Sequence, residues 1–285
     1  MVIKESEVTL NVKKRCYVLG VNRSSYYKWL KAKPRGNDEY IQEQINKIYQ
    51  EHKGTYGYLR ITQTMRNAGI LVNHKKVYRI MRKLGLKAVI RKKWCKRSYR
   101  KENTTYNILN RDFKTSEPLK KLVCDVTELR PVKDKRYYLF SIMDLYNNAI
   151  IALNVSFHND WGLVEKGLEK LTGNMQGILL HSDQGVQFTS IQYREITRQK
   201  NITLSMSRLA NCYDNAAKES FFSHFKEEFY IYYNPKTQDE LYQNIAAFIY
   251  YYNNERIQMR FKMSPVQYLN SQNSLLAANK KDLPY

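Results

Sequence analysis

The sequence has few of the residues that build metal-bound or cross-linked small domains. It has 4 cysteines in 285 residues, they are scattered, and no two of them form a Cys-x-x-Cys pair. The 5 histidines are dispersed as well. A zinc ribbon needs such pairs at short spacing, so none is expected. Scattered cysteines also fit a reducing compartment, and we expect a cytoplasmic protein.

Long apolar stretches are missing too. No secretory signal and no run of eighteen apolar residues is found, so we expect no membrane partner.

Acidic residues are scarce in one half of the chain only. Residues 1–117 hold 28 Lys and Arg against 9 Asp and Glu, whereas residues 118–285 hold 20 against 17. Such a segregated excess predicts that the first half binds DNA and the second is a folded enzyme; a basic surface for solubility is the alternative.

The first 35 residues predict a short helical segment. Two helices are expected between residues 12 and 31, with Gly20 between them and Ser24 as the cap of the second. The Lys-Pro-Arg-Gly sequence at 33–36 then indicates a linker.

Residues 36–90 predict a helix-turn-helix domain. Asp38 is expected to cap a first helix with an amphipathic stripe of isoleucines, and Asn73 to cap a third. Helix, glycine turn and basic helix are typical of this DNA-binding motif. A three-helix packing unit with a solvated basic face is the alternative. The candidate DNA contacts lie on the face opposite to the apolar stripe of the third helix: Lys75, Lys76, Arg79, Arg82 and Lys83.

Residues 91–117 form a basic linker. It opens with Arg91, Lys92 and Lys93, and Trp94 and Tyr99 are interleaved with further basic residues. Positive charge with aromatic rings suits phosphate contact and base stacking. A flexible charged linker is the competing interpretation.

From residue 118 to residue 285 the pattern changes to α/β. Segments 137–143 and 149–155 are rich in β-branched and aromatic residues, and Asn147-Asn148 between them predicts a hairpin. Alternating helices and strands follow, with a strand at 203–206 and a tyrosine-rich helix at 238–252. Ser264 and Pro265 predict one last helical turn.

Three acidic residues are the candidate catalytic and metal-binding groups: Asp125, Asp183 and Glu219. Asp125 is expected to end one strand, Asp183 follows another, and Glu219 lies in a helix predicted from residue 214 to 229. Carboxylates gathered from such elements can hold two hard divalent ions, Mg²⁺ or Mn²⁺. Two ions about 3.5–4 Å apart activate a hydroxyl and stabilise the leaving oxygen of a phosphodiester.

The sequence around these acids carries a family resemblance. Thirty-five residues separate Asp183 from Glu219. The sequence motifs around them are His-Ser-Asp-Gln-Gly at 181–185, Asn-Cys-Tyr-Asp-Asn-Ala at 211–216 and Glu-Ser-Phe-Phe at 219–222. Together they resemble the second-frame product of bacterial insertion sequences of the family numbered three, within the integrase and transposase superfamily.

The resemblance implies a ribonuclease-H-like catalytic core and a transposase. Such an enzyme cuts at the terminal inverted repeats of its element and joins the freed 3′-hydroxyl to target DNA. The resemblance also implies a homo-multimer that holds two ends and an upstream-frame segment as a partner. It places DNA contact at Lys226, two helical turns after Glu219. A nucleoid-associated location follows from a DNA substrate.

Several assignments stay open at this point. The acids alone support a ribonuclease-H-type nuclease equally well, and a catalytically silent DNA-binding regulator is the second alternative. Asp214 is interpreted as the cap of the Glu219 helix. His181 is interpreted as structural rather than as a group near the metals.

Overall fold

The computed structural model describes residues 11–31, 38–88, 106–132, 135–173, 175–208 and 212–281. The expected DNA contacts Arg91, Lys92 and Lys93, with most of the basic linker, lie outside the described residues. Within those residues, no helix combines the length and the apolar character that a membrane span requires.

A five-stranded mixed sheet forms the centre of the second half. Its strands stand in the order β3 (Ile150–Ser156), β2 (Lys135–Asp144), β1 (Lys121–Val132), β4 (Leu179–Ser182) and β5 (Thr203–Met206). The first three are antiparallel to one another, and β4 and β5 run parallel to β1. The Asn147-Asn148 hairpin is confirmed, because Asn148 takes the left-handed backbone conformation between β2 and β3.

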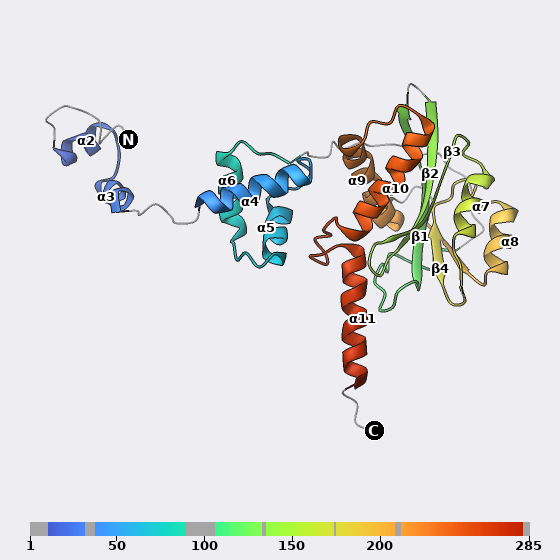
Figure 1. Cartoon of the computed structure of the whole chain (residues 1–285). Helices are drawn as coiled ribbons and strands as arrows, with labels where there is room; N and C mark the ends of the chain where they lie inside the picture. Colours follow the sequence, from blue (N-terminus) through green and yellow to red (C-terminus); the bar gives the residue numbers. More distant parts are fainter. Residues whose placement is uncertain are drawn as a thin grey trace.

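Helices cover both faces of the sheet, as Figure 1 shows. One face packs on α9 (Ala216–Tyr232) and α10 (Gln238–Asn254), the other on α7 (Trp161–Glu169) and α8 (Ile191–Gln199). Successive strand residues point to opposite faces, so Val123 enters the first core while Leu122 and Cys124 enter the second. This three-layer arrangement confirms the expected ribonuclease-H-like α/β core.

Close packing of α7 on the sheet depends on one glycine. A Cβ atom at Gly167 would lie 2.2 Å from the ring of Phe140 on β2. Any side chain there would push α7 away from the sheet, because interiors have no room for such overlap.

The helical domain ahead of the core consists of α4 (Asp38–Glu51), α5 (Tyr58–Asn67) and α6 (His74–Lys83). Their apolar faces meet at Ile45, Ile61 and Val77, all fully buried. Asn73 caps α6 as expected, accepting a hydrogen bond from the amide of Lys75. Asp38 was expected to precede the first helix, but it lies inside α4 and its carboxylate pairs with α6 side chains instead.

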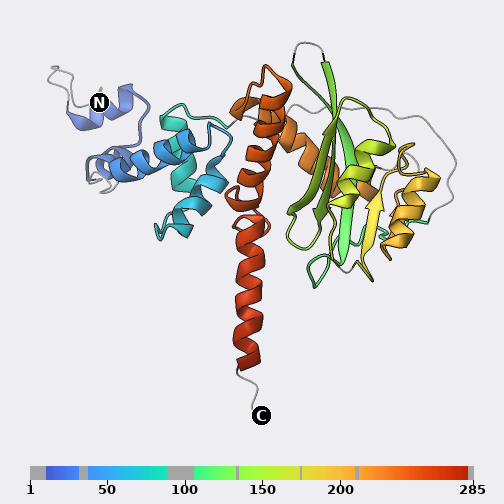
Figure 2. The same cartoon turned by 45° about the vertical axis from the view of Figure 1, so that its right-hand side comes forward.

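This helical domain lies against the core beside α10, a contact visible in Figures 1 and 2. Ile257, which follows α10, belongs to the apolar cluster of the helical domain. Its amide donates a 2.9 Å hydrogen bond to Tyr56 Oη, and Arg60 lies 3.6 Å from Glu228 on α9. The two units therefore share buried apolar and charged contacts.

Two boundary details differ from the expectation. Helices α2 (Val12–Val18) and α3 (Arg23–Lys31) flank Gly20 as predicted, but Asn22 rather than Ser24 caps α3, since Asn22 Oδ1 accepts from the amide and hydroxyl of Ser24. Ser264 and Pro265 begin α11 (Pro265–Lys281), a full helix where one turn was expected.

Candidate active site

Asp125 lies in the middle of β1 and does not end a strand as predicted. The strand continues because the antiparallel pairing with β2 runs on past Asp125, which stands opposite Ser141. Its carboxylate accepts hydrogen bonds from the amide of Val126 at 2.7 Å and from Asn215 Nδ2 at 3.3 Å.

Asp183 follows β4 directly, on the strand next to Asp125. In the parallel pairing Val123 stands opposite His181, and Asp125 and Asp183 each follow two residues later. The charge of Asp183 raises the pKa of Asp125, which indicates that the two carboxylates are close to each other. Asp183 Oδ1 accepts from the amide of Gly185 at 2.9 Å. A Cβ at Gly185 would lie 3.1 Å from that oxygen, which explains glycine at this tight turn.

Glu219 lies in the first turn of α9 with an exposed side chain. The helix packs on the sheet through Phe221, Phe225 and Phe229, which are buried as the i, i+4 spacing predicts. Seven residues after Glu219, Lys226 is half-buried on the same helical face.

The three carboxylates influence one another. Burial raises the pKa of Asp125, and the charges of Asp183 and Glu219 raise it further, whereas the Val126 amide and Lys218 act against this. Burial also raises the pKa of Asp183. The pKa of Glu219 is raised by burial and then by Asp183. Like charges in one low-dielectric region require a counter-charge.

The carboxylates are near neighbours without forming a tight cage. In the part of the chain that the structure describes, no three His, Cys, Asp or Glu side chains are spaced as a ligand cluster for one ion. Asp125 and Asp183 each accept one backbone hydrogen bond, which leaves further acceptor positions on both carboxylates.

Lys218 was not predicted from the sequence as a buried residue of this site. It lies on the buried face of α9, and its Nζ donates to Ser141 Oγ at 2.7 Å. The signal was available, because Phe221, Phe222 and Phe225 follow at i+3, i+4 and i+7 and mark that face as buried.

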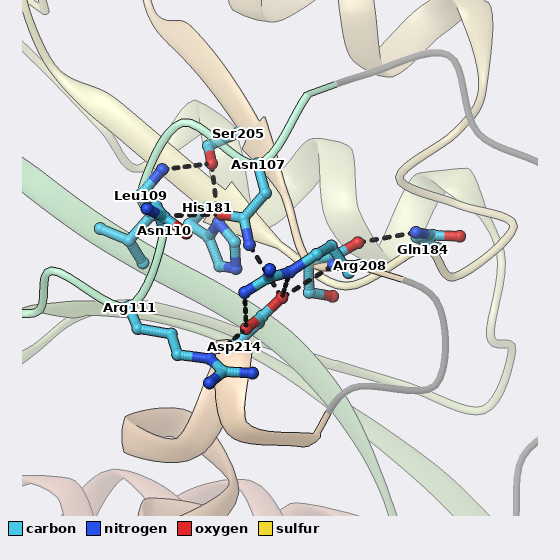
Figure 3. Close-up of polar contacts among 10 residues, drawn as sticks. Asn107, Leu109, Asn110, Arg111, His181, Gln184, Ser205, Arg208 and Asp214 are labelled. Carbon is cyan, nitrogen blue, oxygen red and sulfur yellow. Dashed lines mark hydrogen bonds and ion pairs between the residues drawn. The ribbon is translucent and has the colours of Figure 1, made fainter.

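Asp214 is not the cap of α9, contrary to the prediction. It belongs to a short 3₁₀ turn, Cys212–Asn215, and its buried carboxylate accepts hydrogen bonds from Arg111, Arg208 and Asn107 (Figure 3). The hydrogen bonds of Arg208, then those of Arg111, hold the pKa of Asp214 well below its usual range. This cluster ties the later part of the basic linker to the turn that precedes α9.

His181 is buried, which supports the structural interpretation. Its Nδ1 forms a 2.8 Å hydrogen bond with Ser205 Oγ, which also accepts from the amide of Leu109 (Figure 3). Burial lowers the pKa of His181 to about 4. The ring is therefore neutral at physiological pH and joins β4 to β5.

The candidate DNA contacts on α6 divide into two groups. Lys75, Arg82 and Lys83 are exposed. Lys76 and Arg79 each lie 2.9 Å from a carboxylate oxygen of Asp38, which ties them to α4.

Comparison with known proteins identifies both halves. The family description "HTH-like domain" matches residues 36–94, and "Integrase core domain" matches residues 115–212 and 219–272. The putative transposase InsK of insertion sequence IS150 from Escherichia coli is 38% identical over 258 residues, covering 88% of this chain and 90% of that protein. The IS904 transposase of Lactococcus lactis is 34% identical, covering 79% and 91%.

A further relative is the transposase InsF of IS3A from Escherichia coli, 30% identical over 79% of this chain and 82% of that protein. Among solved structures, the HTLV-2 integrase catalytic core domain superposes with a TM-score of 0.44 at 16% identity, covering 54% of this chain and 98% of that one. The assignment depends on the sequence relatives, and by these the chain belongs to the IS3-type family of DDE transposases.

Proposed function

We propose that this transposase cuts DNA at the ends of its insertion sequence and joins the freed 3′-hydroxyl to another phosphodiester, with Asp125, Asp183 and Glu219 as its catalytic carboxylates. The observation that supports the proposal is the parallel register of β1 and β4, which pairs Val123 with His181, two residues ahead of Asp125 and of Asp183. The raised pKa values of all three acids support it, because they mark groups that influence one another.

The same residues carry the donor chemistry of a divalent-metal site, although the described residues do not hold three of them at ligand spacing. Three carboxylates supply oxygen ligands, which Mg²⁺ and Mn²⁺ prefer, and two such ions per site are part of the proposal. A buried oxygen nearby, Asn215 Oδ1, has no hydrogen-bond partner among the described residues. When bound, the ions would activate the attacking hydroxyl and stabilise the leaving oxygen. The carboxylates would orient this chemistry, and the nearby amide of Asn215 holds Asp125 in place.

DNA binding is assigned to the basic residues outside this centre. Lys226 is suited to the phosphate next to the reacting bond, since it shares a helical face with Glu219. The exposed residues of α6 and the linker residues Arg91, Lys92 and Lys93 are suited to the terminal inverted repeats and target DNA.

The proposal divides the chain into four regions. Residues 1–35 form an N-terminal helical segment, 36–90 the helix-turn-helix domain, 91–117 the basic linker and 118–285 the catalytic core with its C-terminal helices. Bringing two element ends together calls for a homo-multimer, with the upstream-frame segment as a further partner. A cytoplasmic, nucleoid-associated location suits such a substrate.

The decisive experiment compares the wild-type chain with Asp183→Asn on a labelled duplex that carries the element's end, in the presence of Mg²⁺. A denaturing gel should reveal nicked and joined products for the wild type only, while DNA binding and the circular dichroism spectrum stay unchanged. Metal-dependent joining by Asp183→Asn would refute the assignment of the carboxylates.

The same gel separates the alternatives. Cleavage of an RNA–DNA hybrid without joining would indicate a nuclease. Binding with no cleavage, even after addition of the upstream-frame segment, would indicate a regulator.

A further inference from the structure

Lys218 is a buried lysine to which the proposed function gives no role. Its side chain is fully buried one residue before Glu219, and its Nζ lies 4.7 Å and 4.9 Å from the ring centroids of Phe221 and Phe222. Burying an ammonium group is costly unless partners compensate it. A lysine in such a place therefore indicates a requirement that an apolar residue would not meet.

The hydrogen bond of Lys218 indicates what that requirement is. Its Nζ donates to Ser141 Oγ at 2.7 Å, and Ser141 on β2 is the cross-strand partner of Asp125 on β1. Directly opposed residues of two paired strands lie side by side on the same face of the sheet. One hydrogen bond thus connects the first turn of α9, which carries Glu219, to the strand pair at the level of Asp125.

We propose that Lys218 is a positioning residue of the transposase site: its hydrogen bond to Ser141 holds the Glu219 turn of α9 against the strands that carry Asp125. This inference rests on the proposed function, because it takes the two carboxylates as ligands of the same metal centre. Metal ligands must be held within fractions of an ångström, which a single helix packed through phenylalanines does not ensure.

Two other roles for Lys218 predict different results. If Lys218 only fills space, Lys218→Met should leave metal binding unchanged and keep or raise stability, since an apolar side chain of similar length replaces a buried charge. If only its charge matters, Lys218→Met should bind metal more tightly, because a repelling cation is gone. A positioning role alone predicts weaker metal binding.

The test measures Mn²⁺ affinity of the full-length chain without DNA, from the electron paramagnetic resonance signal of free Mn²⁺. Lys218→Met and Ser141→Ala should each raise the Kd about fivefold or more, and kcat for joining a pre-cut end at saturating Mn²⁺ should fall about tenfold with KM for DNA nearly constant. Lys236 and Ser274 are exposed, so Lys236→Met and Ser274→Ala are matched controls that should behave as wild type.

Asp183→Asn separates failure of the inference from failure of the site. If Asp183→Asn loses Mn²⁺ while Lys218→Met and Ser141→Ala bind it as tightly as wild type or more tightly, the positioning role is wrong and the site stands. If Asp183→Asn keeps full affinity, the carboxylate assignment fails and the inference with it. Should Lys218→Met not fold, Ser141→Ala decides alone, since it removes only one oxygen atom.

Discussion

Two groups of charges lie along helix α9, and they have an excess of opposite sign. The first group, called the catalytic cluster after its proposed role, lies near the start of α9 and consists of Asp125, Asp183, Glu219 and Lys218. The docking cluster, nearer its end, consists of Glu228, Arg256 and Arg60, and it lies where the helical domain meets the core. The first has three acids and one base, the second one acid and two bases.

The docking cluster is complete within the protein. Arg256 donates two hydrogen bonds of 2.6 Å to Glu228, and Arg60 lies 3.6 Å from the same carboxylate. Both guanidinium groups also face tyrosine rings, Arg256 that of Tyr252 and Arg60 that of Tyr56, which stabilises the excess positive charge. Burial acts to raise the pKa of Glu228, but Arg256 outweighs it and the pKa lies below its ordinary value.

The charges of the catalytic cluster are not compensated by groups of the protein in this way. All three of its acids have raised pKa values, and the positive charge of Lys218 opposes this for Asp125. The comparison teaches that burial of charge alone does not mark a functional centre. A cluster whose charges are compensated by groups of the protein stabilises an interface, whereas an uncompensated excess of one sign leaves room for a ligand of the other.

The same substitution at the two ends of α9 is the strongest test of this contrast. Glu219→Gln should lower joining about a thousandfold or more, since it removes a metal ligand. The free energy of unfolding of the Glu219→Gln variant should equal or exceed that of the wild type, because the substitution removes a carboxylate that the neighbouring acids repel. Glu228→Gln should lower that free energy by about 3–5 kcal/mol, because Arg256 and Arg60 lose their buried counter-charge.

Urea unfolding followed by circular dichroism, beside the joining assay at low temperature, measures both effects. Destabilisation by Glu219→Gln as large as that by Glu228→Gln would show that the two clusters do the same structural work. Loss of joining by Glu228→Gln in the fully folded state would show that docking is itself part of catalysis.

A second, smaller effect concerns the pH dependence of stability, to which one histidine in the core and one at the docking interface contribute. The pKa of His181 is about 4 in the folded chain against 6.5 for an ordinary histidine, with burial as the cause. Because the unfolded chain binds the proton first, stability is fully present above pH 6.5 and falls as the pH drops from 6.5 towards 4. The difference of 2.5 pKa units corresponds to a loss of about 3 kcal/mol.

His52, which contacts Tyr251 across the docking interface, has its pKa lowered to about 4 by burial but is only partly buried. Its contribution should have the same sign and be smaller. Urea titrations of His181→Gln and His52→Gln at pH 7 and pH 4.5 measure both. An unchanged pH dependence in His181→Gln would contradict the assignment of that loss to His181.

Much of this architecture could be predicted because its signals are local. The strand Thr203–Met206 has the predicted bounds, and the phenylalanines of α9 face the core as their spacing indicates. Asp214 was misassigned because two of its partners, Asn107 and Arg111, lie 107 and 103 residues earlier, although its third partner, Arg208, is only six residues away. Asp125 was placed at a strand end because pairing beyond it depends on β2, a non-local partner.

The smallest expected effects lie on α6. In this helix, cations that pair with Asp38 can be compared with cations for which the described residues provide no salt bridge. Lys75→Ala, Arg82→Ala and Lys83→Ala should each reduce the salt slope of DNA binding by about 1 if each residue contacts a phosphate. Lys76→Ala should change this slope less, because Lys76 is held 2.9 Å from Asp38. Filter binding between 50 and 200 mM salt measures the slopes, and none of the variants should alter Mn²⁺ affinity, since all lie outside the catalytic cluster. Equal slopes for all four variants would mean that the Asp38 pairs open on DNA and that the whole basic face binds as one surface.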